Sequence, residues 1–154
     1  MKTALWILAA LAAAAALWVR LAPADPARWH VDPVTVAPRG TPNEALLRPG
    51  GPDEAPVYDM TPAALMERLD GLALAEPRTR RIAGAVAGGH VTYVQRSWLW
   101  GFPDYVSVRA LPAGEGRATL AIYARARFGT SDLGVNAARV ARWLAALGPA
   151  AGGA

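Results

Sequence analysis

Alternating apolar and polar residues mark two stretches of this 154-residue chain, Tyr93-Val-Gln-Arg-Ser-Trp-Leu-Trp-Gly-Phe-Pro-Asp-Tyr-Val-Ser-Val-Arg109 and Leu120-Ala-Ile-Tyr-Ala-Arg-Ala-Arg-Phe-Gly-Thr-Ser-Asp-Leu-Gly-Val-Asn136. A period of two is typical of strands that bury one face. The first stretch is interrupted by a turn at residues 101–104, where Pro103 has no N–H to donate to a ladder. The two stretches predict strands that each carry one apolar face and one face of arginine and aromatic side chains.

Four strands are expected in this part of the chain, over residues 79–86, 90–100, 105–111 and 117–128. Short glycine-rich turns separate them, at residues 88–89, 101–104 and 113–116. Consecutive strands joined by such turns favour an antiparallel meander. In the fourth strand, Leu120, Ile122 and Ala124 alternate with Tyr123 and Arg125, so its two faces are clearly distinguished.

A helix is predicted on either side of the meander. Thr61-Pro62 begins the first one, because threonine is a good N-cap and proline suits the first helical turn. Its buried stripe is Leu65, Leu69 and Leu72.

The second helix is expected over residues 132–147 with Ser131 as N-cap, and Arg139 and Trp143 lie off its stripe. That stripe consists of Leu133, Ala137, Val140, Leu144 and Leu147. The fold class is therefore α+β over residues 58–148, with helices on one face of a four-stranded antiparallel sheet.

The N-terminal segment is uncharged from residue 4 to residue 19, between Lys2 and Arg20. As a helix it reaches roughly 24 Å, against a hydrocarbon core of about 30 Å. Three interpretations remain: an uncleaved membrane anchor, a signal peptide cleaved after Ala24, or a buried helix. Tryptophans near both ends of the segment favour the anchor, and Lys2 favours a cytoplasmic N-terminus. Residues 1–24 are accordingly expected to anchor or export the rest of the chain.

Residues 25–57 are rich in proline and glycine and are expected to be irregular, wrapping over the domain or spacing it from the membrane. Within this segment, residues 29–33 are expected to dock first, residues 34–36 to form a short edge strand, and Pro42-Asn43 to form a turn. Residues 149–154 are expected to be a disordered tail.

Composition excludes several classes of function. Without cysteine, the chain has neither disulfides nor thiol chemistry. No ligand-spaced histidines, phosphate loop or nucleophile elbow occur, so we expect no metal and no cofactor. His30 is expected to make a structural hydrogen bond, and His90 to be exposed beside a Gly-Gly turn.

The charge is unevenly distributed along the chain. Residues 25–75 hold four arginines and eight acids, whereas residues 76–154 hold ten arginines and four acids. Either the two halves attract each other within one fold, or the basic half presents an anion-binding face. Nucleic acid is not expected as a partner, because the arginines are interleaved with apolar residues and form no basic tract.

One constellation of polar residues could form a site. Its members are Arg96, Asp104, Tyr105, Arg125, Arg127, Asp132 and Asn136. In a structural interpretation, Arg125 and Arg127 form ion pairs with Asp104 or Asp132. In a functional interpretation, the arginines hold an anionic ligand, such as a lipid headgroup or a small carboxylate. Catalysis by these residues is a third possibility.

Four short motifs of the C-terminal part occur together: Arg96-Ser97, Gly101-Phe-Pro-Asp-Tyr105, Arg125-x-Arg-Phe-Gly129 and Ser131-Asp-Leu-Gly-Val-Asn136-x-x-Arg139. In this combination the chain resembles a bacterial family known as domain of unknown function 1499. The resemblance implies a membrane segment, as many members have, but no activity. Ala124 and Ala126 replace serines that the family usually has there, which argues against hydroxyl chemistry.

The expected protein is thus a non-enzymatic ligand- or partner-binding domain of the bacterial envelope. We expect it at the inner membrane with its domain facing the periplasm, or in the periplasm after signal cleavage. The alternatives are an enzyme acting on an anionic envelope substrate and a purely structural envelope protein.

Overall fold

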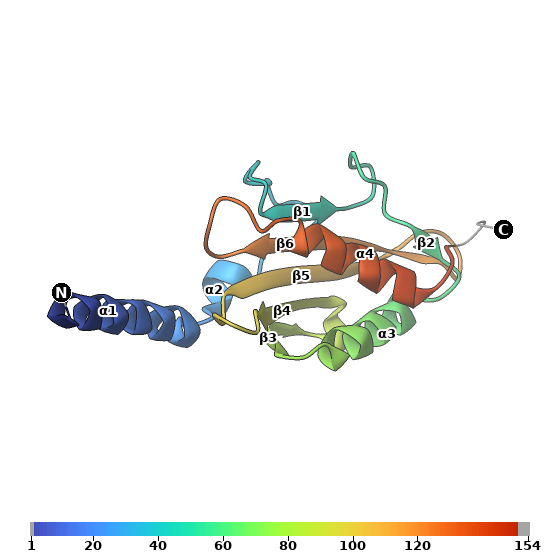
Figure 1. Cartoon of the computed structure of the whole chain (residues 1–154). Coiled ribbons are helices and arrows are strands. Elements are labelled where there is room, and N and C mark those ends of the chain that lie inside the picture. Colours follow the sequence, from blue (N-terminus) through green and yellow to red (C-terminus); the bar gives the residue numbers. More distant parts are fainter. Residues whose placement is uncertain (1, 151–154) are drawn as a thin grey trace.

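The computed structural model describes residues 2–150 and is an α+β fold, as predicted (Figure 1). The first two helices are α1 (Lys2–Leu21) and α2 (Pro26–Trp29), and α3 (Pro62–Ala75) and α4 (Val135–Leu147) follow later. The strands are β1 (Glu44–Leu47), β2 (Val57–Tyr58), β3 (Thr79–Ala85), β4 (His90–Arg96), β5 (Pro103–Pro112) and β6 (Ala118–Ala126), and the short helix η1 (Val86–Gly88) joins β3 to β4. Residues 151–154 of the predicted tail lie outside the described part.

The sheet has six antiparallel strands, so the prediction of four was too low. Strands β3 to β6 form the expected meander, and the order across the sheet is β1-β6-β5-β4-β3. Strand β2 pairs with β6 at residues 118–119, beyond the end of β1. Because β6 is thus paired on both sides and covered on both faces, each of its residues is buried. Pro103 begins β5 instead of lying in the preceding turn, a position where its missing N–H is tolerated.

The edge strand expected at residues 34–36 is not formed. Val34 and Val36 instead belong to a turn around Asp32, which accepts the Val34 N–H through its carboxylate at 3.0 Å and the Val36 N–H through its carbonyl at 3.0 Å. A turn closed in this way leaves neither residue free to pair along a sheet edge. The strand of this region is β1, ten residues further along the chain.

Helices α3 and α4 both lie on one face of the sheet and bury its apolar side chains (Figure 1). Thr61 caps α3 as predicted, because its hydroxyl accepts the Ala64 N–H at 3.2 Å. Leu65 and Leu69 are fully buried there against Val106 and Ile122 of the central strands. This layer is the main hydrophobic core.

Helix α4 begins later and turns a different side to the sheet than predicted. Leu133 and Gly134 have φ values of +56° and +79°, so the helix cannot include them and Ser131 is not its N-cap. Leu133 is 94% exposed, whereas Arg139 and Trp143 are buried. Val140 and Leu147 of the predicted stripe are buried, but Leu133 and Ala137 are exposed. The pattern missed the two other buried residues because a guanidinium and an indole can have their polar atoms satisfied, which hydrophobicity alone does not register.

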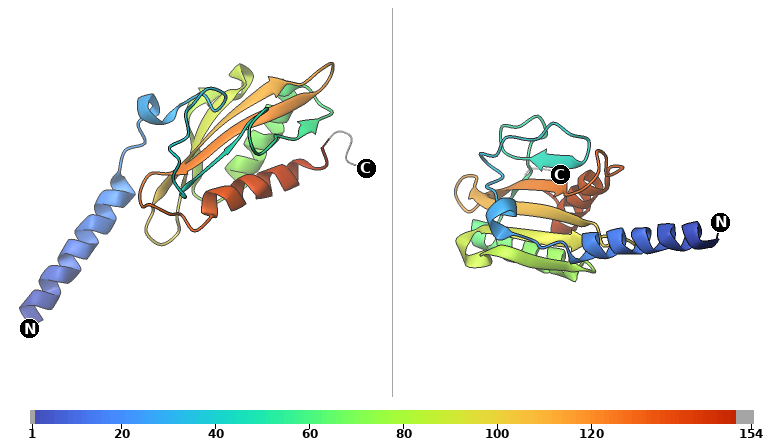
Figure 2. Two further views of the ribbon diagram at one scale, coloured as in Figure 1. Left: turned by 90° about the horizontal axis from the view of Figure 1, so that it is seen from above. Right: turned by 90° about the vertical axis from the view of Figure 1, so that its left-hand side faces the viewer.

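The opposite face of the sheet is covered by the segment that follows α1. Trp29 is buried there and stacks on Tyr105, with ring centroids 3.9 Å apart and planes at 7°. This confirms that residues 29–33 dock on the domain. Helix α1 itself projects from one end of the sheet, away from the body of the domain (Figures 1 and 2). We call this the α1 end; there β4 finishes and β5 begins.

Candidate functional site

Two arginines join α1 to the sheet. Arg96, the last residue of β4, donates to the carbonyl oxygens of Val19 at 3.2 Å, Ala22 at 2.7 Å and Gly101 at 2.9 Å. Arg20 donates in the other direction, to the carbonyls of Trp98 at 3.4 Å and Leu99 at 3.5 Å. The last carbonyls of a helix lack partners within it, and a cation there also suits the helix dipole. The end of α1 is therefore held by the domain.

Two further arginines bind the segment that follows α1. Arg127 donates to the Pro23 carbonyl at 2.7 Å, and Arg125 donates to the Trp29 carbonyl at 2.6 Å. The Arg125 guanidinium is buried between the rings of Trp29 and Tyr123, and in the described part of the chain it has no carboxylate partner. Burial lowers the pKa of Arg125 to about 10, which leaves it charged at neutral pH.

The predicted ion pairs of Arg125 and Arg127 with acids were therefore wrong. Asp104 binds Arg139 at 2.9 Å, and Asp132 accepts the backbone N–H of Asn136 at 2.8 Å. Side chains alternate between the two faces of a strand, so Asp104 faces α4 while Tyr105 faces the segment after α1. The same alternation puts Arg125 on the face away from Asp104. The predicted constellation is divided between two faces and does not form one site.

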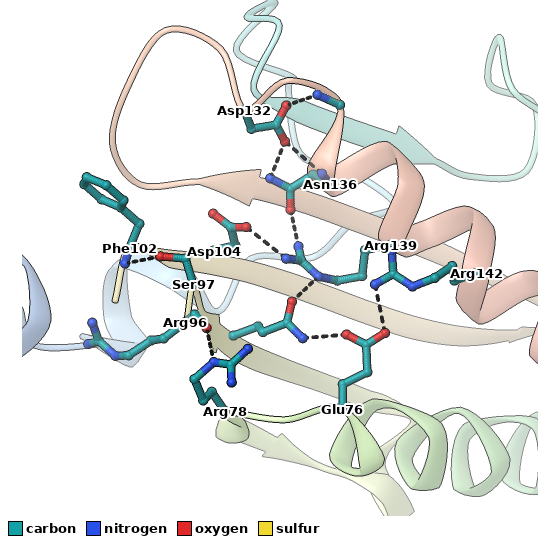
Figure 3. Close-up of polar contacts among 12 residues, drawn as sticks. Glu76, Arg78, Arg96, Ser97, Phe102, Asp104, Asp132, Asn136, Arg139 and Arg142 are labelled. Atoms are coloured by element: carbon teal, nitrogen blue, oxygen red, sulfur yellow. Dashed lines mark hydrogen bonds and ion pairs between the residues drawn. The ribbon is translucent and has the colours of Figure 1, made fainter. Parts of the chain in front are cut away.

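On the helix face, the acids belong to a polar network that Arg139 organises (Figure 3). Arg139 donates to Asp104, to the Gln95 side chain at 2.7 Å and to the Asn136 side chain at 2.5 Å. Gln95 in turn bonds Glu76 at the end of α3. Burial raises the pKa of Asp104, and the hydrogen bond from Arg139 opposes that rise. Each guanidinium nitrogen of Arg139 has an acceptor, so its charge is not available to a ligand. The network joins α3, α4 and the sheet and is structural.

The basic pocket, as we call it, opens at the α1 end. It is a cavity of about 400 Å³, and among residues 2–150 no acidic side chain lines it. None of its arginines forms an ion pair with a carboxylate of residues 2–150. The lining residues are Arg20, Arg78, Thr79, Arg80, Arg96, Ser97 and Gly101.

The arginines of the basic pocket are placed by the backbone. Arg78 has a φ of +60°, an unusual value for a residue with a side chain, and its Nε donates to the Arg96 carbonyl at 3.0 Å (Figure 3). The Arg96 N–H donates back to the Arg78 carbonyl at 3.2 Å. Strain of this kind persists only where surrounding contacts fix it, and it is concentrated at functional sites. These reciprocal bonds hold the two arginines side by side where β3 begins and β4 ends.

The electrostatics of the pocket favour an anion. Burial lowers the pKa of Arg96, and the positive charges of Arg80 and Arg127 lower it further, with an opposing effect from Tyr105. Like charges gathered without a counterion repel one another, and a bound anion would relieve that repulsion. A phosphate or carboxylate group is suited to such a site, because guanidinium groups bind both through paired hydrogen bonds.

The sequence analysis found only Arg96 among the four arginines of the basic pocket. Arg20 was interpreted as the end of an apolar run, Arg80 as part of the strand expected over residues 79–86, and Arg78 was given no role. Three arginines within four residues were a usable signal of basic charge. That Arg20 would join them, from far away in the chain, could not be inferred from local pattern.

Comparison with known families gives a match over most of the chain. The family model described as "Protein of unknown function (DUF1499)" matches residues 25–147. The chain belongs to the DUF1499 family. The match begins with the residues that dock on the sheet and ends with the last residue of α4, so the DUF1499 domain corresponds to the folded body without α1. Comparison with curated proteins and with solved structures gives no match.

Proposed function

We propose that this DUF1499 protein is a membrane-anchored, non-enzymatic domain that binds an anionic phosphate group in the basic pocket. The observation that supports this most directly is the gathering of four arginines around one cavity, with no acidic side chain among the described residues that line it. The chemistry of the ligand is that of a phosphate ester, and its source is either the headgroup of an anionic lipid or a soluble phosphate compound.

The properties of α1 support the membrane anchor. It is 20 residues long, with a mean hydropathy of 2.0 over its most apolar window, and none of its residues is buried in the domain. A helix of this length extends about 30 Å, which matches the hydrocarbon thickness of a bilayer. A signal peptide also meets these criteria, so the argument for retention has to come from the residues that follow.

Contacts just beyond α1 support retention of the anchor. The Ala22 side chain is buried, and the carbonyls of Ala22 and Pro23 are held by Arg96 and Arg127. Cleavage after Ala24 would separate both arginines from those acceptors. We therefore propose a protein of the bacterial inner membrane with its domain on the periplasmic side, with a cleaved periplasmic form as the alternative.

The position of the basic pocket favours a lipid headgroup as the source of the phosphate. Arg20 both ends the apolar run of α1 and lines the pocket. A residue at the end of a membrane-spanning helix lies at the depth of the headgroups, where anionic lipids attract arginine. The pocket then opens where lipid phosphates are most concentrated.

Two alternatives to binding explain less of the pocket. Among the described residues that line it there is no histidine or carboxylate to act as a general base, which supports binding over catalysis. A purely structural role accounts for Arg20, Arg78 and Arg96, which donate to backbone carbonyls. It does not account for Arg80, whose exposed side chain has no hydrogen-bond partner among residues 2–150.

The proposal is tested with the full chain in nanodiscs of phosphatidylcholine alone or with one third phosphatidylglycerol. We expect a higher unfolding midpoint with phosphatidylglycerol, because a ligand that binds only the folded state stabilises it. Arg80→Ala should remove that increase, whereas Arg117→Ala, an exposed arginine of the β5–β6 turn, should keep it.

Inorganic phosphate, added to the phosphatidylcholine nanodiscs, distinguishes the two sources. Stabilisation by phosphatidylglycerol alone identifies a lipid headgroup, and stabilisation by free phosphate identifies a soluble ligand. Equal responses of wild type and Arg80→Ala to both anions would overturn the proposal.

A further inference from the structure

The loop between β4 and β5 exposes large apolar side chains. Trp98 is 73% exposed, Leu99 56%, Trp100 51% and Phe102 40%. Single exposed apolar residues are ordinary on protein surfaces, but a run of four in one loop marks an interaction surface. The loop has no part in the core or in the polar network, so its composition calls for a separate explanation.

This loop lies against the apolar helix. Arg20 donates to the carbonyls of Trp98 and Leu99, and Gly101 is so close to Arg20 that a Cβ at that position would come within 2.7 Å of the Arg20 Cγ. Trp100 and Phe102 lie across from the helix and share with it a cavity of about 320 Å³. Its helical lining is Ala12, Ala15, Ala16 and Val19. The loop therefore lies alongside the C-terminal half of α1, as far as Ala12.

A chain of aromatic rings extends this surface from α1 to the sheet. Trp18 lies 5.7 Å from Phe128, and Phe128 lies 6.0 Å from Phe102, measured between ring centroids. Phe128 follows β6 and Phe102 precedes β5, so both come from the α1 end. Tryptophan is enriched at the boundary between headgroups and acyl chains.

The depth of the loop can be estimated from the helix beside it. Ala16 precedes Arg20 by four residues, which is about 6 Å along a helix axis, and Ala12 lies about 12 Å from Arg20. If Arg20 lies among the headgroups, side chains that face Ala16 lie about 5–10 Å below them, the depth that apolar side chains of interfacial segments occupy. Continuity with α1 thus identifies the occupant of this surface as lipid.

We propose that the loop of residues 97–102 is a second membrane contact, with Trp98, Leu99 and Trp100 inserted into the outer part of the same bilayer that α1 spans. The domain then rests on the membrane by its α1 end and does not move freely on a tether. This inference depends on the proposed anchoring by α1, and it is independent of what the basic pocket binds.

The absence of cysteine makes the test direct, because single-cysteine variants carry one nitroxide label each. We would label Trp98→Cys, Leu99→Cys and Trp100→Cys in the full chain, reconstituted in nanodiscs of phosphatidylcholine with phosphatidylglycerol. Leu17→Cys in α1 is the embedded reference, and Ala87→Cys in η1, at the far end of β4, is the aqueous reference. Accessibility to oxygen and to a water-soluble nickel chelate is measured by power saturation.

We expect the loop labels to be accessible to oxygen and shielded from nickel, as Leu17→Cys is. Nickel accessibility equal to that of Ala87→Cys would overturn the inference, and so would shielding from both reagents, which would indicate a covering protein. A Leu17→Cys label in water would instead overturn the anchor itself. Because three exposed positions are tested separately, the remaining two still show whether the loop is inserted if one variant misfolds.

Discussion

The guanidinium of Arg125 donates a 2.6 Å hydrogen bond to the carbonyl oxygen of Trp29 and also lies 5.4 Å from the centroid of its indole ring. One side chain thus fixes both the backbone and the ring of the residue that docks the N-terminal segment. The ring of Tyr123, 4.5 Å away, covers the guanidinium from another side. Hydrogen bonds to carbonyls and contact with aromatic faces replace the water that this cation loses.

We expect Arg125→Ala to lower the free energy of unfolding by about 2–4 kcal/mol, because it leaves the Trp29 carbonyl without its donor and opens a cavity. Arg125→Lys should lose most of that stability as well, since an ammonium cannot bond several acceptors in one plane. Urea unfolding of the full chain in detergent measures both. A change below about 0.5 kcal/mol in Arg125→Ala would contradict this account.

Arg96→Ala should loosen the junction between α1 and the domain more than it destabilises the core. The variant loses the bonds to Val19, Ala22 and Gly101, which lie at the α1 end and outside the main core. We expect trypsin to cleave after Arg20 at least several-fold faster than in wild type, while the main unfolding midpoint changes little, as in local opening. Arg117→Ala is the matched control, and equal cleavage rates in all three proteins would refute the role given to Arg96.

The side of α4 that faces the sheet predicts different losses of stability for substitutions at two neighbouring residues. Trp143 is 2% exposed, its ring meets Tyr93 edge-on and its indole N–H donates to Glu76 at 2.9 Å, whereas Leu144 is only partly buried. Trp143→Ala should lower the free energy of unfolding by about 3–5 kcal/mol, and Leu144→Ala by about 1 kcal/mol. Denaturant titration of both variants checks the order. A larger effect at Leu144 would restore the stripe predicted from the sequence.

His90 should make stability fall with mild acidification. Burial lowers the pKa of His90, the nearby His30 and Arg109 lower it further, and the Val31 carbonyl and Asp32 oppose them. The unfolded histidine, with a pKa near 6.5, therefore takes up a proton before the folded one does. This contribution to the free energy of unfolding is complete above about pH 6.5 and is lost as the pH falls toward the folded pKa.

The measurement is the unfolding midpoint between pH 7.5 and 5.5. His90→Gln retains a donor for the Val31 carbonyl, which the His90 Nε2 approaches at 3.1 Å, but does not titrate. Its midpoint should therefore depend less on pH than that of wild type. Identical pH profiles for the two proteins would show that His90 is not responsible.

Local patterns predicted the parts of the fold that depend on neighbours in sequence. The meander from β3 to β6, the capped start of α3 and the docking of Trp29 all follow from alternation, capping residues and turn residues. Strands β1 and β2 were missed because they are four and two residues long, lie among prolines and exist only through pairing with β6. The exposure predicted for His90 was wrong, since its ring stacks on that of His30 at 4.0 Å.

The candidate site was harder to predict, for a physical reason. The sequence singled out Arg96, Arg125 and Arg127, and the expected partners were carboxylates or an anionic ligand. Their actual acceptors are backbone carbonyls, which every residue possesses and no sequence pattern reveals. The basic pocket additionally requires Arg20 to meet Arg78 and Arg80 across a distance that only the folded chain closes.

The segment between α1 and the sheet is held through its carbonyl oxygens, so its side chains and its length are constrained differently. Arg96, Arg125 and Arg127 contact the main chain at Val19, Ala22, Pro23 and Trp29. Between Ala22 and Trp29, the identity of most side chains is therefore free to drift, while the number of residues is fixed. One residue inserted or deleted there would shift each later carbonyl out of register with its arginine. A change in the length of this connector is therefore expected to be tolerated less well than a change of its exposed side chains.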